Sequence, residues 1–264
     1  MNPERPRLAP APSAEELARM SLMEHLEELR RRLVRSVLAL VLAFVPCWVY
    51  YREIFKFLLA PLDRVQPGIK LSFLALTDPF TIYFKMAALT AVFLASPFLL
   101  YQLWLFIAPG LYSREKKLAL PFVFFTTLFF LSGGAFGYYV AFPTAAKFLL
   151  GLGADLQAVI TAEKYFGFLL TVILGLGLMF ELPILILLLS LLGVVTPRFL
   201  IRYFRHAVVV IFIVSAIITP TPDIVNLCIF AVPALGLYLL GVAAAFVAER
   251  LKRKVLGESP EAEW

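Results

Sequence analysis

The run Phe166–Val195 most constrains the fold, because its thirty residues contain only one charged side chain. An apolar segment of about 20 residues can cross a bilayer as a helix. The one charge, Glu181, lies near the middle, where an ionisable group costs roughly 2–3 kcal/mol and usually faces protein or a water-filled cavity. Pro183 follows, removes a backbone donor and clashes with the carbonyl of Met179. The run therefore predicts a membrane span whose helix is broken beside a carboxyl group.

Further apolar runs occupy most of the remaining chain. The 264 residues are 61% hydrophobic and only 16% charged, far from the average of soluble domains. We predict an all-α, polytopic integral membrane protein with six transmembrane helices, organised as one membrane domain over residues 13–248. A disordered tail at 1–12 and a cytoplasmic tail at 249–264 flank it. The net charge of +6 comes from residues at the ends of the apolar runs, which argues against nucleic-acid binding.

Six spans are separated by charged or turn-forming segments. We expect them at about Leu33–Tyr51, Asp78–Ile107, Leu118–Phe142, Phe166–Val195, Ala207–Ile218 and Ile224–Val247. Pro97 and Pro233 predict kinks within spans two and six, and Pro61 indicates a turn after span one. Gly133 and Gly137 give span three a small-xxx-small surface for close helix packing. Span five, with 12 residues, reaches only about 18 Å against roughly 30 Å of hydrocarbon.

A charged amphipathic segment precedes the first span. Leucines at 22, 26, 29 and 33 share one helical face. Ser13 followed by Glu16 is a capping-box signature for the helix start. Glu28 and Arg32 form one of two Glu–Arg pairs spaced four residues apart. We expect this helix to lie at the membrane surface and to lead into the first span.

The distribution of lysine and arginine orients the chain in the membrane. The two terminal segments and the loops at 108–117 and 193–206 together carry seventeen of these residues. The segments at 52–77 and 143–164, on the opposite side, carry six. Both termini are therefore predicted to lie in the cytoplasm.

Two other classes of function must be weighed against this pattern. A carboxyl group beside a broken helix also fits a proton-coupled small-solute transporter, with Glu181 as the proton carrier. However, Lys85 is the only other candidate charge, and no second broken span suggests an inverted repeat. An intramembrane enzyme would need a nucleophile–base pair or a metal cluster at depth, and neither histidine lies in a span. We predict that the chain is not an enzyme and needs no cofactor or metal.

Four motifs occur in order between about residues 20 and 250. They are His25-Leu26-Glu27-Glu28-Leu29-Arg30, the segment Tyr101–Tyr112 followed by Glu115, Phe180-Glu181-Leu182-Pro183 and Thr219-Pro220-Thr221-Pro222-Asp223. In this order, and at these places in the topology, they resemble the TatC family, the core subunit of the Sec-independent twin-arginine protein translocase. The last turn departs a little, because Thr221 stands between two prolines where Thr-Pro-Pro-Asp is common.

This resemblance implies a receptor for signal peptides with two consecutive arginines. Such a subunit helps to export folded proteins across a prokaryotic inner membrane, driven by the proton-motive force. The family's recognition carboxylates map onto Glu28 and Glu115, with Phe106 and Arg30 as further peptide-binding residues. An arginine pairs with a carboxylate through two parallel hydrogen bonds, and lysine cannot reproduce that geometry. Two carboxylates from separate segments can therefore select for two arginines.

The resemblance also implies partners within the bilayer, namely single-span TatA and TatB subunits and further copies of the chain. Partners are needed on physical grounds too, because six helices of about 10 Å diameter cannot enclose a lumen for a folded domain. We expect Glu181 and Pro183 to mark where a partner's transmembrane helix docks, with the carboxyl group neutral because burial disfavours its charged form. The residues expected to be structural are Pro61, Pro97, Gln102 and Asp223.

Overall fold

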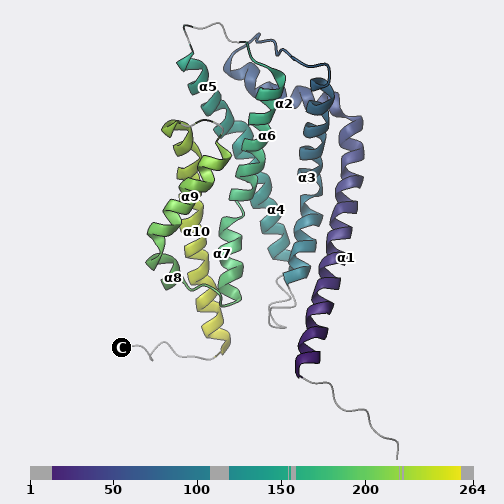
Figure 1. The fold of residues 1–264 in the computed structure, drawn as a ribbon. Helices are drawn as coiled ribbons and strands as arrows, with labels where there is room; N and C mark the ends of the chain where they lie inside the picture. Colours follow the sequence, from purple (N-terminus) through teal and green to yellow (C-terminus); the bar gives the residue numbers. More distant parts are fainter. Residues whose placement is uncertain are drawn as a thin grey trace, which may run out of the picture.

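The computed structural model describes residues 14–107, 119–153, 155, 159–219, 221 and 223–256. The elements within them are helical (Figure 1): α1 (Ala14–Val49), α2 (Tyr51–Val65), α3 (Asp78–Ile107), α4 (Ala119–Phe136), the π-helical segment η3 (Gly137–Ala141), α5 (Phe142–Leu152), α6 (Ala162–Met179), α7 (Leu182–Leu191), α8 (Pro197–Arg202), α9 (Phe204–Ile218) and α10 (Ile224–Leu256). An isolated parallel bridge joins Ser72 to Thr161 in the two segments that precede α3 and α6. The all-α prediction is confirmed.

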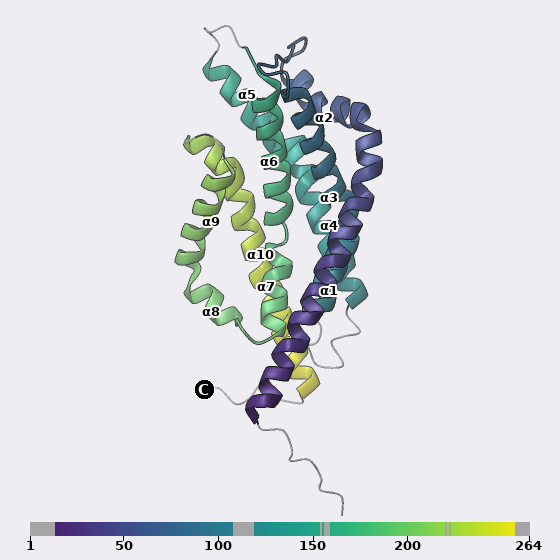
Figure 2. The same cartoon turned by 45° about the vertical axis from the view of Figure 1, so that its right-hand side comes forward.

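Helix α6 is at the centre of the bundle. Helix α1 packs along α3, α4 along α6, and α7 along α10. Figures 1 and 2 show the α1–α3 pair and the α9–α10 pair on opposite sides of α6. The largest fully buried apolar side chains include Phe142, Phe166, Leu169, Leu176 and Phe230. Many large apolar side chains outside this core remain exposed along the helices, which is the kind of surface that a bilayer covers.

Five helical stretches of the described chain are long and apolar enough to cross a membrane. They are Leu26–Val49, Asp78–Ile107, Pro121–Leu152, Ala162–Leu191 and Ile224–Arg250. The fifth predicted span corresponds to α9, a shorter apolar helix of 15 residues, or about 22 Å. In Figure 1 the end of α9 and the start of α10 lie lower in the view than the upper end of α5. The fold is therefore that of a polytopic membrane protein with five candidate spans and one shorter apolar helix.

The amphipathic segment and the first span form one helix. We expected a surface helix that leads into a span at Leu33, but α1 runs without a break from Ala14 to Val49. No proline occurs in this helix before Pro46. Two ion pairs, each between a glutamate and the arginine four residues later, stabilise its charged part. The charged segment therefore leads into the first span as part of one helix, and its place at the membrane surface stays a prediction. Ser13 and the predicted tail at 1–12 lie outside the described residues.

The third span continues beyond its predicted end at Phe142. The π-helical segment η3 joins α4 to α5, and the helical path runs on to Leu152. Pro143 does not stop it: this proline lies in the first turn of α5, directly after the π-helical segment, and the helical path continues through it. The helical path of the third span therefore runs to Leu152, into the predicted outer segment that begins at Pro143.

Pro61 lies inside α2 and does not form a turn, so that expectation was also wrong. A proline leaves the carbonyl four residues earlier without its helical donor, here the carbonyl of Phe57. The hydroxyl of Tyr138 in η3 donates to that carbonyl, and the hydroxyl of Tyr165 in α6 donates to the carbonyl of Leu58 at 2.7 Å. Two tyrosines therefore hold α2 on the bundle, one of them through the carbonyl that Pro61 leaves without its helical donor.

The close packing predicted from Gly133 and Gly137 is confirmed. A Cβ atom added at Gly133 would lie 2.5 Å from the carbonyl oxygen of Leu176 in α6. One added at Gly137 would lie 3.1 Å from Cα of Ile173, also in α6. Because both contacts involve backbone atoms, α4 with η3 and α6 lie at the closest approach that their main chains allow.

Candidate functional site

The break in the fourth span places Glu181 between two helices. Helix α6 ends at Met179 and α7 begins at Leu182. The Glu181 carbonyl accepts the N–H of Leu185 at 2.8 Å, so Glu181 starts the hydrogen-bond ladder of α7. Pro183 is buried in the first turn of α7, where its missing N–H is tolerated. The helix break predicted from the tetrad is confirmed.

Glu181 lines a cavity of about 460 Å³ between α3, α4, α6 and α7. Most of the lining is apolar. However, Oε1 of Glu181 and Nε1 of Trp104, which also lines the cavity, are buried without a hydrogen-bond partner in the described chain. Ser96 and Thr126 also line the cavity, and their hydroxyls donate to carbonyls of their own helices. Buried polar atoms are rarely left unpaired. A polar group that entered this cavity would therefore find two unsatisfied atoms.

Pro97 lies inside α3 as predicted, on the same stretch of helix that lines this cavity. It leaves the carbonyl of Phe93 without its helical donor, and the hydroxyl of Ser96 donates to that carbonyl at 2.8 Å. The helix therefore continues through the proline with a side-chain hydroxyl in place of one backbone N–H.

A second group of candidate residues joins α1 to the last turns of α3. The Nη2 atom of Arg32 donates to Oε1 of Glu28 at 3.1 Å, and its Nη1 atom donates to Oε1 of Gln102 at 3.2 Å. Gln102 is buried, whereas the side chains of Arg32 and Glu28 are 19% and 31% exposed. Through Arg32, Gln102 ties α3 to α1.

The structure describes some of the other predicted peptide-binding residues. Phe106 is half-buried in the last turn of α3, and Arg30 is exposed on α1. Glu115 lies outside the described residues, so its position relative to Glu28 stays a prediction. Arg32 was not among the predicted site residues, although its spacing of four from Glu28 was a signal that could have found it.

Asp223 stands directly before α10 and caps its first turn. Its Oδ1 atom accepts the backbone N–H of Asn226 at 2.7 Å, and its Oδ2 atom accepts the side-chain amide of Asn226 at 2.8 Å. The backbone hydrogen bond from Asn226 is the main reason that the pKa of Asp223 is lowered from its ordinary value. Asp223 therefore caps the first turn of α10.

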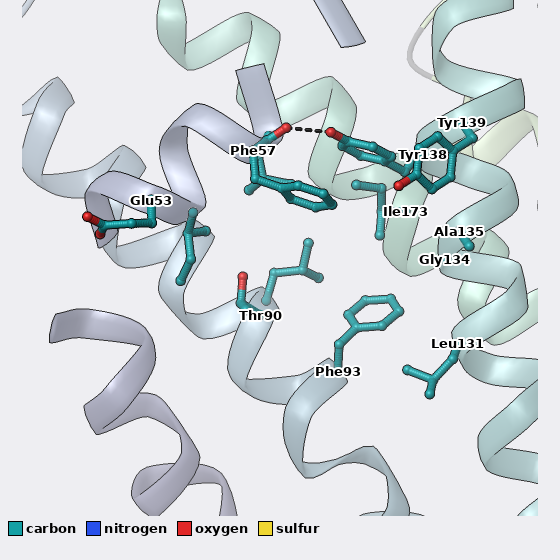
Figure 3. Close-up of a pocket in the computed structure, with 13 residues that line it drawn as sticks. Glu53, Phe57, Thr90, Phe93, Leu131, Gly134, Ala135, Tyr138, Tyr139 and Ile173 are labelled. Carbon is teal, nitrogen blue, oxygen red and sulfur yellow. Dashed lines mark hydrogen bonds between the residues drawn. The ribbon is translucent and has the colours of Figure 1, made fainter. Parts of the chain in front are cut away.

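Another cavity, of about 470 Å³, lies between α2, α3, α4 with η3, and α6 (Figure 3). Figure 3 shows the Tyr138 hydroxyl pointing at the Phe57 carbonyl, so this polar atom is satisfied within the chain. Glu53 is the one charged residue of its lining, and no lining residue carries a buried polar atom without a partner. This cavity offers no chemistry comparable to that around Glu181.

Metal or thiol chemistry finds no support in the described part of the chain. No group of three or more His, Cys, Asp or Glu side chains there could hold a metal ion. Cys47 is buried and Cys228 half-buried, and both are free thiols. The two carboxylate sites are therefore the candidates for function.

Known proteins share this sequence and fold. Residues 24–233 match the family model described as Sec-independent protein translocase protein (TatC). A protein of that description from Koribacter versatilis is 45% identical over 255 residues, which cover 95% of this chain and 94% of the relative. One from Helicobacter pylori strain J99 is 43% identical over 235 residues, covering 85% and 88%. A crystal structure of the twin-arginine translocase receptor TatC matches with a TM-score of 0.77 and 34% identity, covering 85% of this chain and 99% of that one.

Proposed function

This chain belongs to the TatC family and is the non-enzymatic receptor subunit of a twin-arginine translocase, and from that premise we propose that it binds twin-arginine signal peptides through Glu28 and Glu115. The cargo is folded protein, the energy source is the proton-motive force, and the location is the inner membrane. In this proposal α9 is a sixth span and both termini are cytoplasmic. The bias of lysine and arginine supports that orientation, as do the start of α1 and the end of α10, which lie at the same end of the fold (Figure 1).

The placement of Glu28 is the observation that carries the recognition proposal. Glu28 lies on α1 and is tied through Arg32 to Gln102, near the end of α3. Glu115 follows the last residue of α3, Ile107, by eight residues, and a chain of that length extends at most about 26–29 Å. The chain length therefore supports two carboxylates near one end of the α1–α3 pair, as recognition of adjacent arginines requires.

The chemistry of these carboxylates suits arginine. A guanidinium offers parallel N–H donors that match the two oxygens of a carboxylate, whereas an ammonium acts as a point charge. Phe106, in the last turn of α3, adds an aromatic surface that can contact a peptide or a cation. Arg30 is exposed nearby in the sequence and would interact with acidic or carbonyl groups of a bound peptide.

Glu181 is proposed to serve a different purpose, the docking of a transmembrane helix from a TatA- or TatB-type partner. The unpartnered Glu181 Oε1 and Trp104 Nε1 atoms in one apolar cavity support this role. Leaving a buried polar group unsatisfied costs about 1–3 kcal/mol, which a polar side chain of a partner helix would recover. Self-association of the chain is also part of the proposal, as implied by the family.

The recognition proposal is tested by crosslinking a twin-arginine signal peptide to the purified chain, with a Lys-Lys peptide as the control ligand. Glu28→Ala and Glu115→Ala are each expected to weaken binding of the twin-arginine peptide about tenfold, as loss of a charge-assisted hydrogen bond does. Glu27→Ala is the matched control, because Glu27 pairs with Arg31 in the same helix but is 73% exposed. Unchanged binding and export in both single variants and the double variant would disprove this assignment.

The docking proposal is tested with Glu181→Ala. Crosslinking to the partner's transmembrane helix should fall, while crosslinking to the signal peptide should remain, because the two sites lie on different parts of the fold. An equal loss of both would show that Glu181 has no separate docking role.

A further inference from the structure

The Arg32 side chain is held at both ends of its guanidinium. Its Nη2 atom engages Glu28 at 3.1 Å and its Nη1 atom engages Gln102 at 3.2 Å, so the contact with Glu28 uses only one nitrogen and one carboxylate oxygen. Its Nε atom is buried without a hydrogen-bond partner in the described chain. The position of the guanidinium therefore depends on these two acceptors.

We propose that Arg32 is a positioning residue that makes Glu28 selective for the guanidinium of a signal peptide over an ammonium group. This inference rests on the proposed role of Glu28 in peptide recognition. Arg32 engages Oε1 of Glu28, and within the described part of the chain no contact to Oε2 is seen. A peptide arginine then binds a carboxylate that is already held in one orientation against α3.

Selectivity follows from the charges of this pair. Glu28 and Arg32 together are neutral, so an approaching cation is attracted by the carboxylate and repelled by the neighbouring guanidinium. An ammonium group binds mostly through its point charge, so the repulsion by Arg32 weakens its binding most. A guanidinium also binds through directional hydrogen bonds in a fixed plane, and these bonds do not depend on the net charge of the Glu28–Arg32 pair. Arg32 therefore penalises lysine more than arginine.

Gln102 completes the arrangement, because it prevents Arg32 from closing onto Glu28. Gln102 is only 4% exposed and its amide oxygen holds Nη1 of Arg32 on the α3 side. Without this acceptor Arg32 can turn a second nitrogen toward Glu28 and occupy both carboxylate oxygens. The pair would then compete with the peptide instead of orienting the carboxylate for it.

The experiment measures the affinities of twin-arginine and Lys-Lys signal peptides for the purified full-length chain, and the readout is their ratio. Arg32→Gln keeps a hydrogen-bonding side chain of similar reach but removes the charge. It is expected to raise Lys-Lys affinity and lower the selectivity ratio about fivefold, the size of one partly exposed ion pair. Arg31→Gln is the matched control, because Arg31 pairs with Glu27 at 3.6 Å and both side chains are more than half exposed. Its ratio should not change.

A second variant keeps the test decisive if Arg32→Gln does not fold. Gln102→Met leaves every charge in place and is expected to weaken twin-arginine binding about fivefold, again lowering the ratio. A merely structural role for Arg32 or Gln102 would lower binding of both peptides equally, and an unchanged ratio in either folded variant overturns the inference. If Glu28→Gln also leaves twin-arginine binding intact, the proposed role of Glu28 fails instead.

Discussion

Replacing Gly133 with alanine tests the contact between α4 and α6 that positions the break at Glu181. A Cβ atom at this position would lie 2.5 Å from the Leu176 carbonyl oxygen and 2.8 Å from Cβ and Cγ of Phe180. An ordinary contact of this kind needs roughly 3.5 Å. The backbone of α6 cannot rotate away as a side chain can, so α4 must move by about 1 Å.

The expected cost is the balance of two effects. Overpacking of this kind costs typically 1–3 kcal/mol. Alanine recovers up to about 1 kcal/mol relative to glycine, because it restricts the unfolded chain and favours helix. With that full gain the net loss is up to about 2 kcal/mol, which in a protein of this size lowers Tm by as much as roughly 4–8 °C.

The assay is thermal unfolding of the purified protein in detergent, compared with Gly167→Ala. Gly167 lies in α6, the helix that Gly133 of α4 packs against, but a Cβ atom there would meet nothing within 4 Å, so this substitution should be neutral or slightly stabilising. The Gly133→Ala variant should also show weaker partner crosslinking, because Phe180 directly precedes Glu181. If both variants melt at the same temperature, the argument from close packing is refuted.

Further predictions concern the tyrosine contact to α2, the cap of α10 and the cavity beside Glu181. Tyr138→Phe removes the donor to the Phe57 carbonyl and should cost about 1–3 kcal/mol in unfolding free energy, against little change for the exposed Tyr139→Phe. Because the pKa of Asp223 is lowered, its contribution to stability is present above about pH 4 and is lost as pH falls through the folded pKa. The melting temperature of Asp223→Asn should therefore depend less on pH in this acid range than that of the unmodified protein. Equal pH dependence of the two melting temperatures would contradict the role of Asp223 as a cap. Trp104→Phe should leave the fold intact but weaken crosslinking of a partner helix, since its Nε1 has no partner within the described chain.

The spans could be predicted from sequence because hydropathy and chain length alone determine them. The span predicted at about Asp78–Ile107 matches α3 within the described residues, and the break before Pro183 followed from one proline beside one carboxylate. Pro61 was misread because its local signal is that of a turn. Its place inside α2 depends on hydroxyls from Tyr138 and Tyr165, which are distant in sequence and cannot be paired with it from a single chain.

The candidate sites were also predictable to different degrees, because a local signal can be read from sequence and a contact between distant residues cannot. Glu181 stands out locally, because a charge in an apolar run is anomalous wherever it occurs. Glu28 does not, since it belongs to an ordinary charged helix face, and only the family resemblance singled it out. The bridge from Arg32 to Gln102 spans 70 positions of sequence, so no local pattern could have revealed it.

Helix α3 carries one residue of each proposed site, and this governs how the variants must be read. Gln102 binds Arg32 beside Glu28, whereas Trp104, two positions on, lines the cavity of Glu181. Residues two apart on a helix point in nearly opposite directions, so each side chain can be changed without touching the other site. A change that moves the end of α3 as a whole must instead affect peptide and partner crosslinking together. Measuring both in Gln102→Met and Trp104→Phe therefore separates loss of one contact from displacement of the helix.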